Sequence, residues 1–235
     1  MKEDLDSDRI RYDVDLPLLR LMHLVSPSLP VGAFTYSAGI EWAVEAGWIR
    51  RVGDLEQWLS DQLHHGLVPL DLPIAMRMHR AAERGDLDGM GRWIDWLLAG
   101  RETAELRQEE INRGRALADL LNAWGLPNAD RWKPQLARSQ TAGFAFAASG
   151  WKVTADAMAA GLTWGWLENL TLAAIKIIPL GQTEGQQLLY RLLPAIPDAV
   201  RRAAVLKDED IGASSPALAI ASSAHEQQYT RLFRS

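Results

Sequence analysis

Histidine side chains are the first place to look for metal or acid–base chemistry, because imidazole binds metals and titrates near neutral pH. The chain has five of them, His23, His64, His65, His79 and His225. His64 and His65 are adjacent, so on a helix they would point about 100° apart and could not easily share one metal ion. The segment from His225 to Tyr229 approaches the zinc motif H-E-x-x-H, but Tyr229 stands where the second imidazole is needed.

These patterns favour structural histidines over metal ligands. We interpret His64, His65 and His79 as surface or interface residues at helix ends. The alternative hypothesis is a small helical metal-binding protein or metalloenzyme that uses His64 and His65 with nearby carboxylates. Tight stoichiometric binding of a metal by the chain would favour that alternative.

Other catalytic signatures are missing from the sequence. There is no cysteine, which excludes disulfides, thiolate metal sites and cysteine nucleophiles. None of the motifs G-x-x-x-x-G-K-[ST], G-x-S-x-G and G-x-G-x-x-G occurs. We therefore predict no catalytic residue, no metal site and no cofactor. The ten tryptophans leave a further alternative, a helical module that binds a small apolar ligand, although most of them should fill the core or an interface.

Composition indicates an ordinary globular chain with an acidic balance. Its 235 residues include 25 Lys+Arg and 30 Asp+Glu, and 48% are hydrophobic. That apolar content suffices for a packed core, and the net charge of −5 argues against nucleic acid as a partner. Residues 1–15 are acidic and lack the apolar region of a signal peptide. We expect them to form a flexible segment of a cytoplasmic protein.

The most apolar long window, Ala155–Ile178, is long enough to cross a bilayer. It carries Asp156, Glu168 and Lys176, however, and charges at those depths are costly in lipid. We therefore predict a buried helix and no membrane partner.

Helix-end signals recur along the chain. Asp86, Thr103 and Thr154 each precede an apolar segment with helical spacing, where their side chains could cap the first turn. Ser215 followed by Pro216 marks the start of the last helix, which we expect to end near Tyr229.

Strand signals are weak, because no stretch alternates with enrichment in β-branched residues. We predict an all-α fold of about nine or ten helices. Residues 16–235 should form a single multihelical domain that includes a docking tail, residues 225–235.

Aromatic side chains occur in two segments in a way that is unusual for an ordinary solvent-exposed surface. The segment Leu29–Trp42 is a Pro-Gly-aromatic loop that leads into a helix, and aromatic residues on loops are candidate interface anchors. The tail alternates aromatic, apolar and basic residues, whereas chain ends are usually polar. It could dock on its own body or on a partner, and both alternatives stay open.

Charged residues dominate the segment Arg101–Arg115, which has four arginines and four glutamates. Arg101 with Glu105, and Glu109 with Arg113, have the i, i+4 spacing of helical ion pairs. The segment is a solvated helix face or a polar docking surface, and the sequence favours the former.

Four blocks in order carry a resemblance to a known family. They are Leu18–Trp48, the R-E-T-x-E-L-R segment of Arg101–Arg115, the W-x-E-x-x-x-x-A-x-K-x-x-P-x-G-Q block of Trp166–Gln182, and the ending Pro216–Ser235 with H-E-x-Q-Y-x-R-L-F-R-S. Together they cover most of the chain, which resembles the UreF family of urease accessory proteins.

Three residues depart from the family pattern. Ala33 replaces a frequent glycine, Ala38 a frequent glutamine and Thr230 a usual serine. If the loop required a positive φ at position 33, Ala33 would be strained.

The resemblance implies a function as well as a fold. UreF proteins are all-α, form homodimers and are not enzymes. They bridge UreD, also called UreH, and the GTPase UreG on apo-urease, where they modulate GTP-dependent nickel insertion.

The resemblance also implies partner-binding residues. The candidates are Phe34, Tyr36, Glu41, Lys176, Tyr229, Arg231, Leu232, Phe233 and Arg234. Lys176 lies in an otherwise apolar stretch, so its ammonium must reach water or a carboxylate. The family implies a role in regulating the GTPase, and the alternative is a snorkelling surface lysine.

Overall fold

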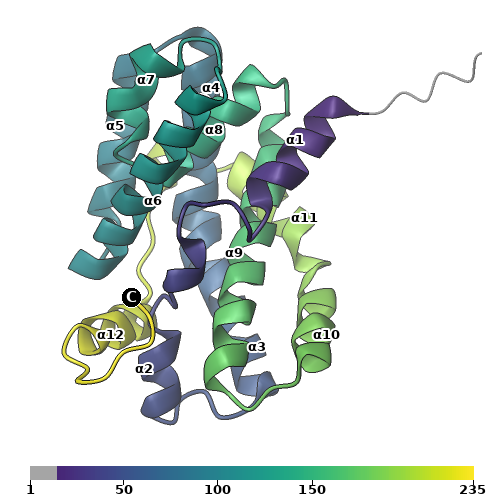
Figure 1. The fold of residues 1–235 in the computed structure, drawn as a ribbon, viewed down its shortest axis with the longest axis vertical. Coiled ribbons are helices and arrows are strands. Elements are labelled where there is room, and N and C mark those ends of the chain that lie inside the picture. Colours follow the sequence, from purple (N-terminus) through teal and green to yellow (C-terminus); the bar gives the residue numbers. More distant parts are fainter. Residues whose placement is uncertain (1–14) are drawn as a thin grey trace, which may run out of the picture.

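Helices make up all the regular structure of the described chain. The computed structural model describes residues 15–235, and these contain no strand. The α-helices are α1 (Leu16–Val25), α2 (Ile40–Glu45), α3 (Val52–Gln62), α4 (Leu72–Arg84), α5 (Leu87–Ala99), α6 (Ala104–Ala123), α7 (Ala129–Leu136), α8 (Gln140–Gly150), α9 (Ala155–Ile177), α10 (Gln182–Leu192), α11 (Ala195–Ala204) and α12 (Pro216–His225) (Figure 1). The all-α prediction is confirmed. The expectation of a flexible acidic segment at 1–15 lies outside the described residues, apart from Asp15.

The described residues form slightly more helices than predicted, and two of these helices, α7 and α11, involve prolines. Pro134 lies inside α7, whose N-cap Asn128 has a φ of 63°. Pro194 is the N-cap of α11, which follows α10 almost directly. N–H groups in the first turn of a helix have no intrahelical acceptor. Proline, which lacks a backbone N–H, is therefore well tolerated at a helix start.

The predicted capping residues begin their helices. Asp86 accepts a hydrogen bond from Gly89 N at 2.8 Å, which caps α5. Thr103 and Thr154 do the same for α6 and α9. The last helix begins at Pro216 as predicted but ends at His225, so the segment around Tyr229 is not helical.

A π-helical segment, Leu63–Asp71, joins α3 to α4, so the chain is helical without a break from 52 to 84. Asp71 is the N-cap residue of α4, but its backbone is helical and its side chain makes no capping hydrogen bond. Pro69 lies inside the π-helix and its carbonyl accepts from Gly212 N at 2.9 Å.

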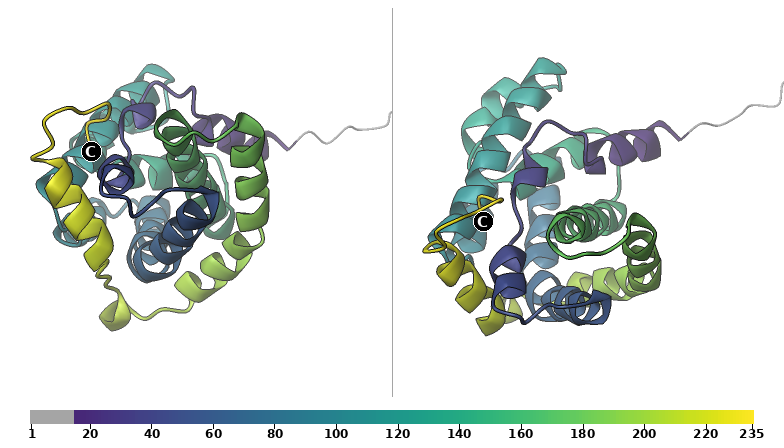
Figure 2. Two further views of the ribbon diagram at one scale, coloured as in Figure 1. Left: turned by 90° about the horizontal axis from the view of Figure 1, so that it is seen from below. Right: turned by 60° about the horizontal axis from the view of Figure 1, so that its bottom comes forward.

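Two hydrophobic clusters form the interior. One lies among α4, α5, α6, α7 and α8, and the other lies among α2, α3, α9, α10 and α11. Helices α4 and α9 contribute to both, through Met78 and Met76 of α4, and through Met158 and Leu167 of α9. These two helices therefore join the halves seen in Figures 1 and 2.

The apolar helix α9 is part of this interior. Among residues 15–235, no helix is long and apolar enough to cross a membrane. The small-residue helix α8 is buried from Thr141 to Ser149, and it approaches α6 closely. A Cβ on Gly114 of α6 would lie 2.6 Å from the carbonyl carbon of Ser139.

Candidate docking surface

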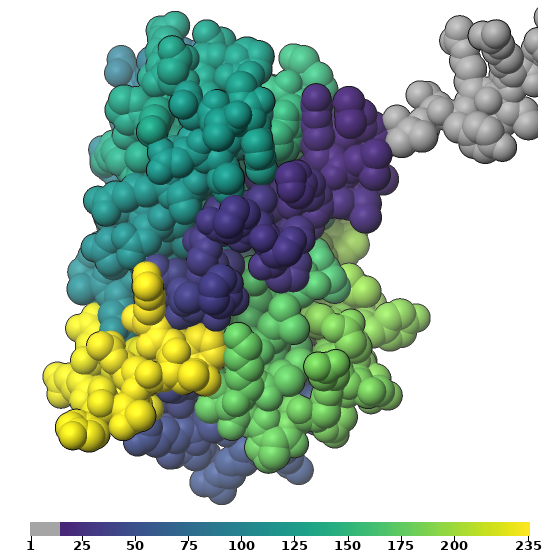
Figure 3. Space-filling model, viewed as in Figure 1, coloured from purple at the N-terminus to yellow at the C-terminus, as the bar shows by residue number. Residues whose placement is uncertain are grey.

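The C-terminal tail packs on the body of its own chain. The backbone N–H of Arg234 donates to the carbonyl of Thr35 at 2.8 Å. Ser37 donates to the carbonyl of Ser235 twice, from its backbone N–H at 2.7 Å and from its hydroxyl at 2.6 Å. The tail, yellow in Figure 3, therefore lies beside the N-terminal loop, drawn in dark purple and blue.

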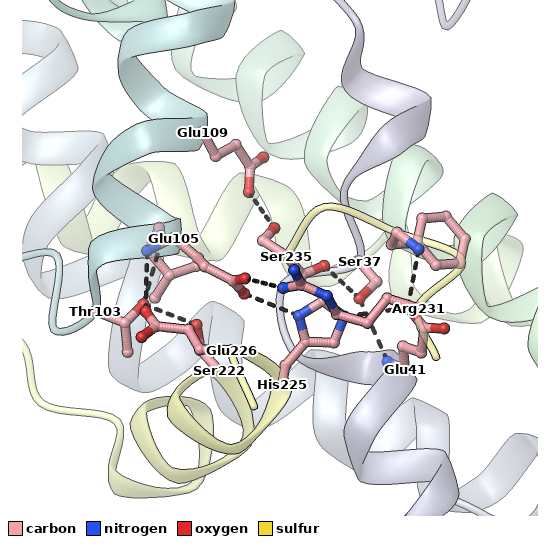
Figure 4. Close-up of polar contacts among 12 residues, drawn as sticks. Ser37, Glu41, Thr103, Glu105, Glu109, Ser222, His225, Glu226, Arg231 and Ser235 are labelled. Carbon is pink, nitrogen blue, oxygen red and sulfur yellow. Dashed lines mark hydrogen bonds and ion pairs between the residues drawn. The ribbon is translucent and has the colours of Figure 1, made fainter. Parts of the chain in front are cut away.

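Glu41 of α2 fixes the course of the tail. The residue is buried, with 8% of its surface exposed. It accepts from Leu232 N at 2.6 Å and from Phe233 N at 2.9 Å. A third contact joins it to His225 Nε2 at 3.1 Å. Glu41, a candidate for direct partner contact, is thus occupied inside the molecule (Figure 4).

Helix α2 reaches this position through a left-handed turn. Its N-cap, Gly39, has a φ of 76°, and a Cβ there would lie 3.0 Å from that of Ala221 on α12. Only glycine combines that conformation with so close an approach. Ala38 beside it also has a positive φ, 47°, whereas Ala33 does not. The strain anticipated at position 33 is therefore absent.

Helix α6 supplies the other side of the tail site. Glu105 contacts His225 Nδ1 at 2.8 Å and Arg231 Nη1 at 2.5 Å. Glu109 accepts from the Ser235 hydroxyl at 3.1 Å and forms the predicted ion pair with Arg113 at 2.7 Å. The charged face of α6 therefore binds the chain's own tail and is not simply solvated (Figure 4).

Lys176, at the end of α9, connects the tail to the N-terminal loop. Its Nζ lies 5.9 Å from the ring centre of Phe34 and 5.7 Å from that of Phe233. Both distances are within the range of cation–π attraction. The side chain is exposed, so the ammonium reaches water as expected and also contacts two aromatic faces.

The candidate residues divide into exposed and buried groups. Tyr36, Glu41 and Phe233 are buried, and the Tyr36 hydroxyl accepts from Asn112 at 3.4 Å. Tyr229 is fully exposed and Leu232 is 65% exposed. We call the exposed group the docking surface; it consists of Phe34, Lys176, Tyr229, Arg231, Leu232 and Arg234.

A buried ion network underlies α6, and the sequence pattern did not predict it. Arg101 pairs with Asp71 and with Glu110 Oε2, the latter at 3.3 Å, rather than with Glu105. Glu110 Oε1 accepts from the Ser139 hydroxyl at 2.6 Å and from Thr141 N at 2.9 Å. Residues so distant in sequence leave no local pattern that would reveal their pairing.

Electrostatics in this network favour the ionised forms. Burial alone would raise the pKa of Glu110, but the Arg101 guanidinium and the hydrogen bonds from Ser139 and Thr141 lower it overall. Burial likewise opposes the charge of Arg101, yet Asp71 and Glu110 raise its pKa above the ordinary value.

A cavity of about 170 Å³ lies against this network. Apolar residues such as Phe144 and Trp166 line it together with Asp71, Arg101 and Glu110. The alternative function, a module that binds a small apolar ligand, would call for a dry apolar pocket. The charged groups in the wall of this cavity do not fit such a pocket.

The histidines do not form a metal site in the described part of the chain. His64 Nδ1 lies 3.1 Å from Arg202 Nη1, and His65 is exposed. Among residues 15–235, no group of three or more His, Asp or Glu is placed to hold a metal ion. The interpretation of His79 as a surface or interface residue at a helix end is wrong, because it is buried within α4 and its Nε2 lies 2.8 Å from the carbonyl of Val153.

His225 is the main feature that the sequence did not reveal. In the sequence, only its place in the segment that approaches the motif H-E-x-x-H, at the start of the tail, set it apart. In the structure its ring is fully buried between two carboxylates.

Fold and surface together define an all-α protein with an exposed aromatic and basic surface. The UreF family model matches residues 49–193. Urease accessory protein UreF of Pseudomonas putida strain W619 is 48% identical over 221 residues, which is 94% of this chain and 99% of that protein. The UreF proteins of Alcanivorax borkumensis and Klebsiella pneumoniae are 46% and 45% identical, over 92% of this chain and 97% of each relative. The chain therefore belongs to the UreF family of urease accessory proteins.

Proposed function

We propose that this chain is a non-enzymatic scaffold in urease maturation. It binds UreD, also called UreH, and the GTPase UreG, and this assembly docks on apo-urease. There it modulates GTP-dependent nickel insertion. It acts as a homodimer in the cytoplasm, and the metal and the nucleotide are held by its partners.

One observation carries this proposal. Three segments far apart in the sequence, which hold Phe34, Lys176 and the tail, meet at one exposed surface. Each of them belongs to a block by which the chain resembles its family. Aromatic side chains beside arginines are typical of the residues that dominate binding energy at protein interfaces.

The internal contacts of the tail also support the proposal. Glu41 and Glu105 hold the tail backbone and Arg231 in place, while Tyr229 and Leu232 project outward. A surface ordered before binding loses less conformational entropy when the partner arrives.

Co-expression with UreD and UreG, followed by size-exclusion chromatography with light scattering, tests the proposal. We expect the wild-type chain to form a stoichiometric complex. The double variant Tyr229→Ala, Leu232→Ala removes two exposed side chains and should weaken assembly roughly tenfold or more. These substitutions are preferable to truncation after Ala224, which would also remove the buried His225.

Tyr190→Ala is the matched control. Tyr190 is 77% exposed on α10, on the other side of the lower half of the molecule from α12 (Figures 1 and 2). Its loss should leave assembly unchanged. A folded wild-type chain that binds neither partner would refute the scaffold function. A double variant that assembles like the wild type would show that the tail is not the docking element.

A further inference from the structure

Both ring nitrogens of His225 face a carboxylate. Nδ1 lies 2.8 Å from Glu105 Oε2 and Nε2 lies 3.1 Å from Glu41 Oε2. The histidine side chain is 0% exposed, and the two glutamate side chains are 10% and 15% exposed. Water therefore has little access to either contact (Figure 4).

This arrangement requires one proton more than a neutral imidazole supplies. A neutral ring has one donor and one acceptor nitrogen, and an ionised carboxylate only accepts. One of the two contacts would then bring two lone pairs together. An imidazolium donates on both sides and satisfies both contacts.

The other contacts of the carboxylates place that proton on the ring. Glu41 accepts two backbone N–H groups, from Leu232 and Phe233, and Glu105 accepts from Arg231. Donors directed at a carboxylate stabilise its ionised form. The extra proton is therefore better held by the imidazole than by either glutamate.

We propose that His225 is a buried imidazolium that latches the tail to the body, and that loss of its proton releases the tail. The charged groups around it in the described structure come from three elements: Glu41 of α2 and Glu105 of α6 contact the ring, and Arg231 of the tail pairs with Glu105. At the end of its own helix, the carboxylate of the C-cap residue Glu226 accepts from the backbone N–H of Glu105.

The direction of the pH dependence follows from these charges. With the proton, two carboxylates are balanced by the imidazolium and Arg231. Without it, two nearly buried carboxylates face a neutral ring, and an unbalanced buried charge is costly. The contacts that hold the tail therefore weaken when the ring loses this proton at higher pH.

The latch can be measured on the wild-type chain alone, without any partner. Nitrogen NMR of the histidine rings reports which nitrogens carry protons. The spectrum is recorded at about pH 7.5, where an unperturbed imidazole is mostly neutral. We expect His225 to carry protons on both nitrogens. A neutral His225 at this pH, with the tail still docked, would overturn the proposal.

Hydrogen exchange at the amides of Leu232 and Phe233 reports tail docking. We expect their protection factors to fall roughly tenfold or more between about pH 7 and pH 9.5, as the charge-assisted contacts are lost. His225→Gln, which offers one donor and one acceptor, should remove the protection and its pH dependence, whereas His65→Gln should change neither. Undiminished protection in the wild type at high pH would overturn the proposal even if the His225 variant does not fold. Since no partner is present, the result is independent of the proposed scaffold function.

Discussion

Glu110→Gln tests how much the buried ion network of Asp71, Arg101 and Glu110 stabilises the fold. Glu110 lies on α6, and its carboxylate receives three contacts, from Arg101, Ser139 and Thr141. Two of these donors lie at the start of α8, where N–H groups lack helical acceptors. Glutamine keeps the shape of the side chain but removes the charge.

The expected loss follows from the hydrogen bonds. A bond to a charged group contributes roughly 1.5–3 kcal/mol and a neutral one roughly 0.5–1.5 kcal/mol. Weakening three such bonds by about 1 kcal/mol each predicts a loss of about 3 kcal/mol in the free energy of unfolding. Urea denaturation near pH 7 measures it. Glu56→Gln is the matched control, because its ion pair with Arg191 is partly exposed and should contribute less than about 1 kcal/mol.

The pH dependence gives a second, independent check. The folded protein lowers the pKa of Glu110 below its ordinary value of 4.5. The ionised carboxylate therefore stabilises the fold fully above 4.5, and this stabilisation is lost as pH falls through the lowered folded pKa. The gap between wild type and Glu110→Gln should shrink on acidification. A loss under about 1 kcal/mol near pH 7, or a gap that does not change with pH, would refute the reasoning.

Three further substitutions probe the loop, the tail and the helix packing. Lys176→Ala removes two cation–π contacts of roughly 0.5–1 kcal/mol each. It should leave folding and complex assembly intact but alter the coupling of GTP hydrolysis to urease activation. Unchanged activation would argue against a role of Lys176 in regulating the GTPase. Ala38→Gly relieves a positive φ and should raise the free energy of unfolding by roughly 0.5–1 kcal/mol, as measured in urea. Gly114→Ala should destabilise the protein by roughly 1–3 kcal/mol, despite the better helix propensity of alanine, because its Cβ would meet the backbone at the start of α8. A variant that is more stable than the wild type in thermal unfolding would contradict the close packing of α6 and α8.

Local signals in the sequence were sufficient for the fold class and for many helix starts. Asp86, Thr103 and Thr154 cap their helices because side chain and acceptor site lie within one turn. The same kind of reasoning missed α11, because Pro194 follows one helix closely and is the N-cap of the next. It also missed α7, which contains Pro134 and begins after an N-cap with a positive φ.

The site was only partly predictable, because its contacts join distant segments. The family resemblance supplied Glu41 and Lys176 as candidates, but not what they touch. Glu41 meets residues 184 to 192 positions away, and periodicity carries no information at that range. Whether the tail packs on the body or elsewhere depends on such contacts, and therefore required the structure.

The bond between Ser37 and Ser235 spans 198 positions, and this has a consequence for the order of events during synthesis. The helices α4 to α8 of the first cluster follow one another along the chain, so they can begin to pack while the chain is still being made. The surface that joins the N-terminal loop to the tail can form only after Ser235 has been added. A ribosome-bound chain can thus acquire most of its core before it displays this surface, so a premature encounter with a partner would find the body without the tail in place.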